Sequence, residues 1–187
     1  MSRAAYKLGC LSDGVWQEHV HLRLFRNSTS SEKNPRIEAT LPDGDPSIFS
    51  KLAECMSEPY FLLYLLHTPR GEGNPGRYQS PPLAGEEVKD FLDRLGTYLS
   101  SDSRFDLWIH SPSDQATLVW DRHDIIYAYG LLDQFLERLK SLGFCEGLPE
   151  IPSPHEHHYR KDFDADASSL LKHWEWSHSE LHAEDEQ

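Results

Sequence analysis

The residues best suited to chemistry in this chain are histidines, of which 187 residues include eleven. The densest group is His155-Glu156-His157-His158. On an extended segment alternate side chains point the same way, so His155 and His157 would share one face and Glu156 would lie opposite. Two imidazoles at this spacing can ligate a metal ion, but the sequence identifies no third ligand. We therefore expect exposed or packed histidines, and we assign no metal and no cofactor.

A second candidate is the glycine-rich loop 67–84. Residues 71–76 match the GxGxxG pattern of dinucleotide-binding turns. Pro81 and Pro82 then prevent the helix that would hold a pyrophosphate. The loop also carries Arg70 and Arg77, whose guanidinium groups match carboxylate or phosphate oxygens. It is either an anion-binding site or a surface loop whose arginines merely neighbour acids.

Asp121 and His123 lie between two predicted strands, close enough to provide a general base. Turns also favour these residue types for local reasons. No GxSxG or SxxK motif supplies a nucleophile, so the catalytic residues stay unassigned. If a ligand site forms, the residues predicted to build it are His67, Arg70, Arg77, Tyr78, His123, His155, His157 and His158.

The charge is strongly acidic, at −13 overall, and it is unevenly distributed. Residues 1–36 hold six basic residues against three acidic ones, so the rest of the chain carries −16. Such a surface repels phosphate backbones and attracts basic proteins, so we expect no nucleic-acid partner.

The leading hypothesis is a non-enzymatic interaction module that binds a basic partner, as inhibitor or immunity proteins do by analogy. The alternative is a protein that binds a small molecule or anion, conceivably an enzyme, through the loop 67–84 and nearby histidines. An enzymatic role stays open, with a non-enzymatic one favoured.

The chain shows no sign of a membrane or of export. No uncharged apolar run reaches the length of a membrane span, and the N-terminus lacks the apolar region of a signal peptide. Cys10, Cys55 and Cys145 form no CxxC pair and no disulfide framework. These features predict a cytoplasmic protein without a membrane partner.

Apolar periodicity predicts an α+β fold, with a mixed or mainly antiparallel sheet of about five to six strands and three to four helices packed on it. Strands are expected at 18–26, 36–41, 60–67, 105–110, 116–121 and 125–129. Helices are expected after the N-cap Asp45, over 88–99, over 131–142 and from Asp164 or Asp166 towards Leu181.

Three prolines make 146–160 an extended strap. We expect residues 1–163 to form one domain that includes this strap. Residues 164–187 should add a C-terminal helix and an acidic tail, packed on or appended to the same domain.

Overall fold

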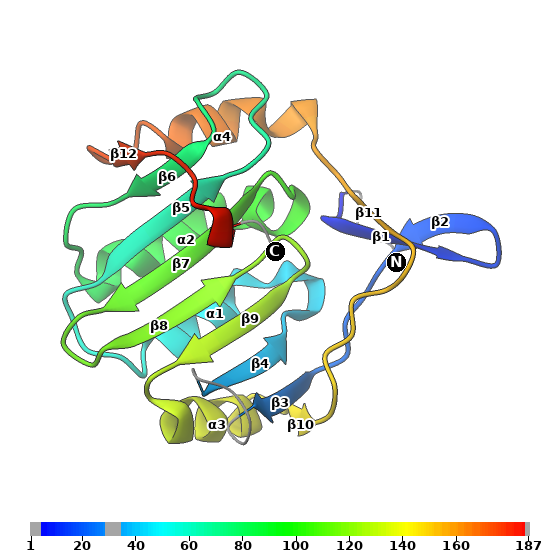
Figure 1. Ribbon diagram of the computed structural model, residues 1–187, viewed down its shortest axis with the longest axis horizontal. Helices are drawn as coiled ribbons and strands as arrows, with labels where there is room; N and C mark the ends of the chain where they lie inside the picture. The colour runs from blue at the N-terminus through cyan, green and yellow to red at the C-terminus, as the bar shows by residue number, and fades with distance from the viewer. Residues whose placement is uncertain (1–4, 29–34, 186–187) are drawn as a thin grey trace.

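Hydrogen bonding sorts the strands into two sheets. The computed structural model describes residues 5–28 and 35–185 (Figure 1). The large sheet runs, in spatial order, β10 (Cys145–Glu146), β3 (Leu24–Ser28), β4 (Arg36–Thr40), β9 (Ile125–Tyr129), β8 (Ala116–Trp120), β7 (Phe105–Ser111), β5 (Phe61–Leu66), β6 (Gly76–Gln79) and β12 (Ser177–Ser179). The small sheet runs β11 (His155–His157), β1 (Leu8–Ser12) and β2 (Val15–Glu18).

The prediction of about five to six strands is wrong, although the fold is α+β. Within the described residues the large sheet alone has nine strands and the small one three. The edge strands β10 and β12, and β6 beside β12, are two to four residues long and show no alternation of their own. Each of these strands forms because it pairs with backbone groups of a neighbouring strand that would otherwise be unpaired. The local sequence does not indicate this pairing. The hairpin of β1 and β2 did have a local signal, because Asp13 and Gly14 both adopt positive φ in a two-residue turn.

The first three helices and the central meander match the predictions closely, whereas the fourth helix does not. The helices are α1 (Pro46–Ala53), α2 (Gly85–Ser101), α3 (Leu132–Ser141) and α4 (Asp164–Leu170), with short 3-10 turns η1 (Pro42–Gly44), η2 (Lys161–Phe163) and η3 (Ala183–Asp185). The Asp45 carboxylate accepts a hydrogen bond from the Ser47 N–H at 2.9 Å, which caps α1 as predicted. Strands β7, β8 and β9 pair antiparallel in sequence order, which confirms the meander.

The predicted strand 18–26 has the wrong start and the wrong buried face. Strand β3 begins at Leu24, while Val20 and Leu22 are 53% and 74% exposed. His21 is buried instead, and its Nε2 donates to the carbonyl of His123 at 2.8 Å. The side chain that residues 19–23 bury is therefore the one that makes a long-range hydrogen bond, and the apolar alternation of the segment does not determine the buried face.

The C-terminal helix is also shorter than predicted. Helix α4 ends at Leu170, and the Trp176 indole N–H donates to the Leu170 carbonyl at 3.0 Å. Trp174 stacks on Phe91 of α2 at 4.8 Å, so the aromatic residues turn the chain back onto the body. The chain then adds β12 to the sheet edge beside β6.

Helices α1 and α2 cover one face of the large sheet and bury its apolar side chains against their own (Figure 1). The opposite face lies open, and the chain after β12 crosses it (Figure 1). The small sheet projects from the body beside the turn between β8 and β9 (Figure 1). Among the helices described, none combines the length and apolar character needed to span a bilayer.

Candidate metal centre

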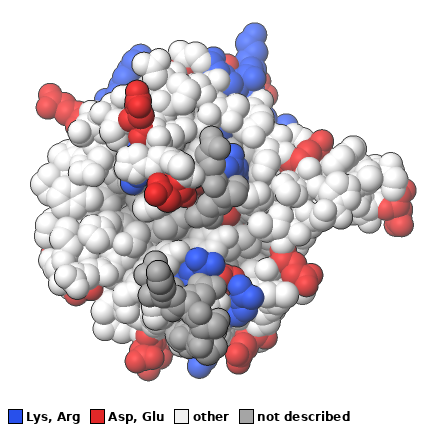
Figure 2. Space-filling view, viewed as in Figure 1, with Lys and Arg blue, Asp and Glu red and all other residues white. Residues whose placement is uncertain are grey.

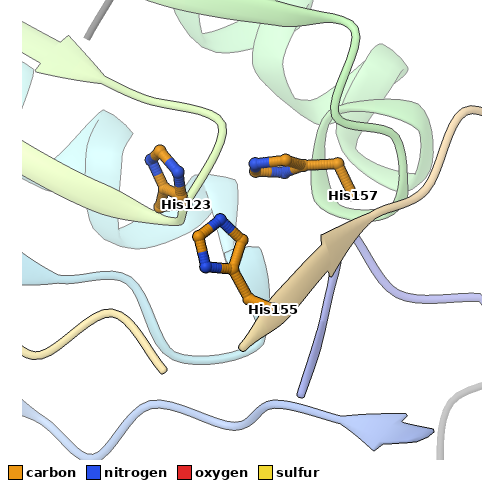
Figure 3. Close-up of side chains that lie close together, drawn as sticks. All are labelled: His123, His155 and His157. Atoms are coloured by element: carbon orange, nitrogen blue, oxygen red, sulfur yellow. The ribbon is translucent and has the colours of Figure 1, made fainter. Parts of the chain in front are cut away.

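The histidines of the strap meet a third histidine from the large sheet. His123 lies in the turn 121–124 between β8 and β9, and His155 and His157 lie on β11. Figure 3 shows the three rings facing a common space between the turn and β11. One ring nitrogen from each residue lies within 4.8 Å of the other two. We call His123, His155 and His157 the histidine triad.

The turn that presents His123 is held by its two aspartates. The Asp121 carboxylate accepts from the backbone N–H groups of His123 and Ile125, both at 2.9 Å. Asp124 adopts a positive φ of 58°, and its carboxylate accepts from the Trp120 indole at 2.8 Å. The buried Lys7 ammonium lies 3.0 Å from the same carboxylate. These contacts fix the position of His123 before any ligand binds.

Strand β11 is positioned by its neighbour. It pairs antiparallel with β1, so that Leu8 lies opposite His157 and Cys10 opposite His155. Because the segment is extended, His155 and His157 both reach His123, while His158 turns away. His158 packs edge-on against Tyr6 at 4.7 Å and lies 3.4 Å from the Glu156 carboxylate.

The ring separations bring the three imidazoles within reach of one metal ion. The centroids are 5.3 Å apart for His123 and His155, 4.8 Å for His123 and His157, and 5.2 Å for His155 and His157. With metal–nitrogen bonds of about 2.0 to 2.1 Å, tetrahedral angles would place ligated imidazole centroids about 5.2 Å apart. The histidine triad is therefore close enough to hold one shared ion.

Hydrogen bonds select the ring nitrogens that remain free to ligate. His123 Nδ1 donates to the Asp121 carboxylate at 3.0 Å, and His155 Nδ1 donates to the Pro152 carbonyl at 2.9 Å. In both rings Nε2 then carries the lone pair. A carboxylate or carbonyl behind a histidine is the usual support of a metal ligand, because it fixes the tautomer and raises the basicity of the ring.

His157 is neutral in its surroundings. Burial, followed by the neighbouring His123 and His155, lowers its pKa from 6.5 to about 3. Its Nδ1 is buried and has no hydrogen-bond partner among the described residues. A buried ring nitrogen without a partner costs free energy, and the neutral ring is the form that binds metals.

A second histidine pair supports the turn from outside. His21 Nε2 donates to the His123 carbonyl, so His21 Nδ1 accepts from His19 Nε2 at 3.2 Å. Burial, followed by the charge of His21, lowers the pKa of His19 from 6.5 to about 4. The neutral His19 ring therefore acts as a hydrogen-bonding group behind the triad.

The other predicted site residues lie elsewhere. His67 Nε2 lies 2.9 Å from Asp106, whose second oxygen accepts from the Arg122 N–H at 2.8 Å, one residue from His123. Arg70 pairs with Asp164 at 3.0 Å. Arg77 and Tyr78 lie on β6, where Arg77 faces Asp185 and the Tyr78 hydroxyl donates to the Asn74 carbonyl. The structure thus brings together His123, His155 and His157, and it leaves the two arginines apart.

The sequence alone indicated part of the histidine triad. The spacing of His155 and His157 indicated a shared face, and Asp121 with His123 was noted separately as a turn. His123, His155 and His157 were all among the candidate ligand residues, but no spacing pattern indicated that the turn would meet the strap, because His155 lies 32 positions after His123. The hydrogen bonds from these rings to Asp121 and to the Pro152 carbonyl were not predicted, although each joins residues two or three positions apart.

No protein family, no curated protein and no solved structure matches this chain. The geometry of the histidine triad is therefore the basis for its proposed chemistry.

Proposed function

We propose that this protein binds a divalent transition metal ion, with zinc the best match, through His123, His155 and His157. The observation that carries this proposal is the convergence of three imidazoles, two of them supported by Asp121 and the Pro152 carbonyl. Imidazole ligands suit zinc, copper, iron and nickel. Zinc is the best match among these, because three histidine ligands with an open fourth position are a known kind of zinc site.

The triad leaves a fourth position open to solvent. His155 is exposed, and the His123 side chain keeps 12% of its surface accessible. Structural zinc sites are closed by four protein ligands, whereas catalytic sites have three and bind water at the fourth. A metal held here would lower the pKa of that water and could present hydroxide at neutral pH. Hydrolysis or hydration is the reaction class that such a centre supports.

The proposal is tested by titrating Zn²⁺ into the metal-free full-length protein against a chromophoric chelator. We expect one tight equivalent, with affinity reduced at least tenfold in His157→Gln and in His155→Gln. His173→Gln is the matched control, because His173 lies on the body beside Phe91 and outside the triad. Equal affinity of His157→Gln and the wild-type protein would overturn the proposal.

Cobalt substitution tests the geometry and the open position together. Co²⁺ in a tetrahedral site absorbs visible light strongly, whereas octahedral Co²⁺ absorbs weakly. We expect strong absorption that shifts when azide is added, because azide would displace the water. A weak spectrum would contradict the tetrahedral assignment, and a strong spectrum that azide leaves unchanged would contradict the open position.

A basic protein partner remains a second candidate, supported by the net charge of −13. Figure 2 shows acidic side chains scattered over the visible face, at its rim and also near its middle. The large apolar side chains that are exposed in the described residues all lie on the small sheet, the segment after it, and the strap: Leu11, Val15, Trp16, Val20, Leu22, Leu148 and Ile151. Such a surface suits a protein interface. Binding of a cationic protein that does not weaken with added salt would count against this candidate.

A further inference from the structure

The open face of the large sheet contains a pocket of about 380 Å³. The sheet register brings its residues together, because Leu63 lies opposite both Gln79 and Trp108, and His110 lies opposite both Phe61 and Thr117. All of these side chains point away from the helices, since their neighbours along each strand are the buried ones. The volume falls within the range of small-molecule sites.

The pocket combines an apolar floor with donors at its edge. Phe61, Leu63 and Trp108 supply most of the floor, and Arg77 stands at the wall with its guanidinium 5.8 Å from the centre of the Trp108 ring. The Trp108 indole N–H is buried and has no hydrogen-bond partner in residues 5–28 and 35–185. Around the pocket the surface over β5, β7 and β8 is largely uncharged (Figure 2). The site therefore offers donors and a single positive charge to an otherwise apolar ligand.

Arg77, the cation of this pocket, contacts the C-terminal segment of the same chain. Arg77 Nη1 lies 3.4 Å from the Asp185 carboxylate and 2.6 Å from His182 Nδ1. Asp185 is buried, and its carboxylate also accepts from the His182 N–H at 2.7 Å. The C-terminal segment that carries both residues is the one that crosses the open sheet face (Figure 1). A carboxylate thus already occupies the position where an anionic ligand would meet Arg77.

We propose that this pocket binds a small carboxylate with an aromatic or aliphatic body, and that Asp185 competes with the ligand for Arg77. The carboxylate of the ligand would take the guanidinium, and its body would lie on Phe61, Leu63 and Trp108. Phosphate esters fit less well, because Arg77 is the only cationic residue among those that line the described pocket. This site is independent of the histidine triad.

Calorimetric titration of the full-length protein with phenylpropanoate tests the proposal, with neutral phenylpropanamide as the matched ligand. We expect Asp185→Asn to bind phenylpropanoate about fivefold more tightly than the wild-type protein, since the competing charge is gone. Arg77→Gln should bind it about tenfold more weakly. Phenylpropanamide should bind weakly and gain nothing from Asp185→Asn. Asp93→Asn is the control, because Asp93 is an exposed carboxylate on α2 that pairs with Lys89.

Two results would overturn the proposal. One is equal affinity for the acid and the amide, and the other is the same affinity in Asp185→Asn and Asp93→Asn. A nuclear magnetic resonance measurement on the wild-type protein guards against a variant that fails to fold. The indole N–H resonance of Trp108, assigned by its loss in Trp108→Phe, should shift on addition of phenylpropanoate. An unshifted resonance at saturating ligand would also overturn the proposal.

Discussion

Two polar clusters connect the region of the strap to the large sheet, and they differ in how completely their groups are paired. The first is the histidine triad. The second is the arginine cluster, which consists of Arg104 with Asp102, Glu72 and Asp164. Arg104 immediately precedes β7 and is fully buried. Its Nη2 also donates to the carbonyl of Arg160, the last residue of the strap, at 2.9 Å.

The arginine cluster is closed. Asp102 accepts from Arg104 Nε and Nη2 at 2.8 and 2.9 Å, and Glu72 and Asp164 accept from the same guanidinium at 3.0 and 3.1 Å. Asp102 also receives the Arg160 N–H at 2.8 Å. Every contact is provided by the chain, so nothing is left for a ligand. The loop 67–84, which carries Glu72, is held by this cluster.

The histidine triad is open by comparison. Its outer nitrogens are paired with Asp121 and Pro152, while its inner lone pairs face one another. A buried polar group that lacks a partner usually marks either strain or a bound group that supplies the partner. The comparison supports a stabilising role for the arginine cluster, and it is consistent with our proposal that the histidine triad binds a metal ion.

The largest expected effect is on the arginine cluster. Arg104→Ala leaves Asp102 and Glu72 buried without a counter-charge, which should lower the free energy of unfolding by about 3 to 5 kcal/mol. Urea denaturation measures this change. The control is Arg138→Ala, because Arg138 is exposed and lies 3.8 Å from an exposed Glu54, so its loss should cost less than about 1 kcal/mol. Equal losses in the two variants would contradict the assignment of Arg104 to stability.

Zinc should stabilise the protein through the histidine triad alone. At a free concentration of about 100 times the dissociation constant, Zn²⁺ should raise the free energy of unfolding by about 2.7 kcal/mol, or somewhat less if unfolded histidines also bind it. His157→Gln should lose this gain and keep its metal-free stability largely intact. Denaturation of both proteins with zinc and with a chelator provides the measurement. A similar gain in His157→Gln would place the metal elsewhere.

Loss of the Asp121 charge behind His123 should weaken zinc binding without abolishing the site. Asp121→Asn keeps an oxygen for the backbone N–H groups of the turn but loses the charge behind the ring. We expect zinc affinity to fall by about 10- to 100-fold. Asp114→Asn is the matched control, because Asp114 also holds a backbone N–H in a turn, that of Ser57, away from the triad. Unchanged affinity in Asp121→Asn would mean that the carboxylate only shapes the turn.

The smallest expected effect concerns pH and the histidine pair behind the turn. The pKa of His19 is lowered from 6.5 to about 4 by burial and then by His21, while Asp124 opposes this shift. The unfolded chain therefore binds more protons between these values, and stability should fall as the pH drops through this window.

Because His19 is partly exposed, we expect its contribution to stay below about 1 kcal/mol. Urea denaturation at about pH 7 and about pH 4.5, in the presence of a chelator, should show a shallower fall in His19→Gln than in the wild-type protein. Identical pH dependence in the two proteins would exclude this role for His19.

Much of the fold was predictable because its signals are local. The cap at Asp45, the stripe of α2 and the alternation in the meander each depend on residues close in sequence. The failures share the opposite property. Val20 and Leu22 alternate like core residues, yet the hydrogen bond from His21 to His123 decides which side chain is buried. Likewise, Trp174 and Trp176 end α4 by packing on a helix about 80 residues earlier in the chain.

The sequence by itself determined helices α1 to α3, the meander, the acidic charge and the extended spacing that places His155 beside His157. Only the tertiary structure decided that His123 completes the triad, that Arg104 closes its own cluster and that Asp185 reaches Arg77. The physical reason is that periodicity and capping act over one or two turns of chain. A coordination centre or a buried ion pair instead needs groups whose distance depends on how sheets and straps pack.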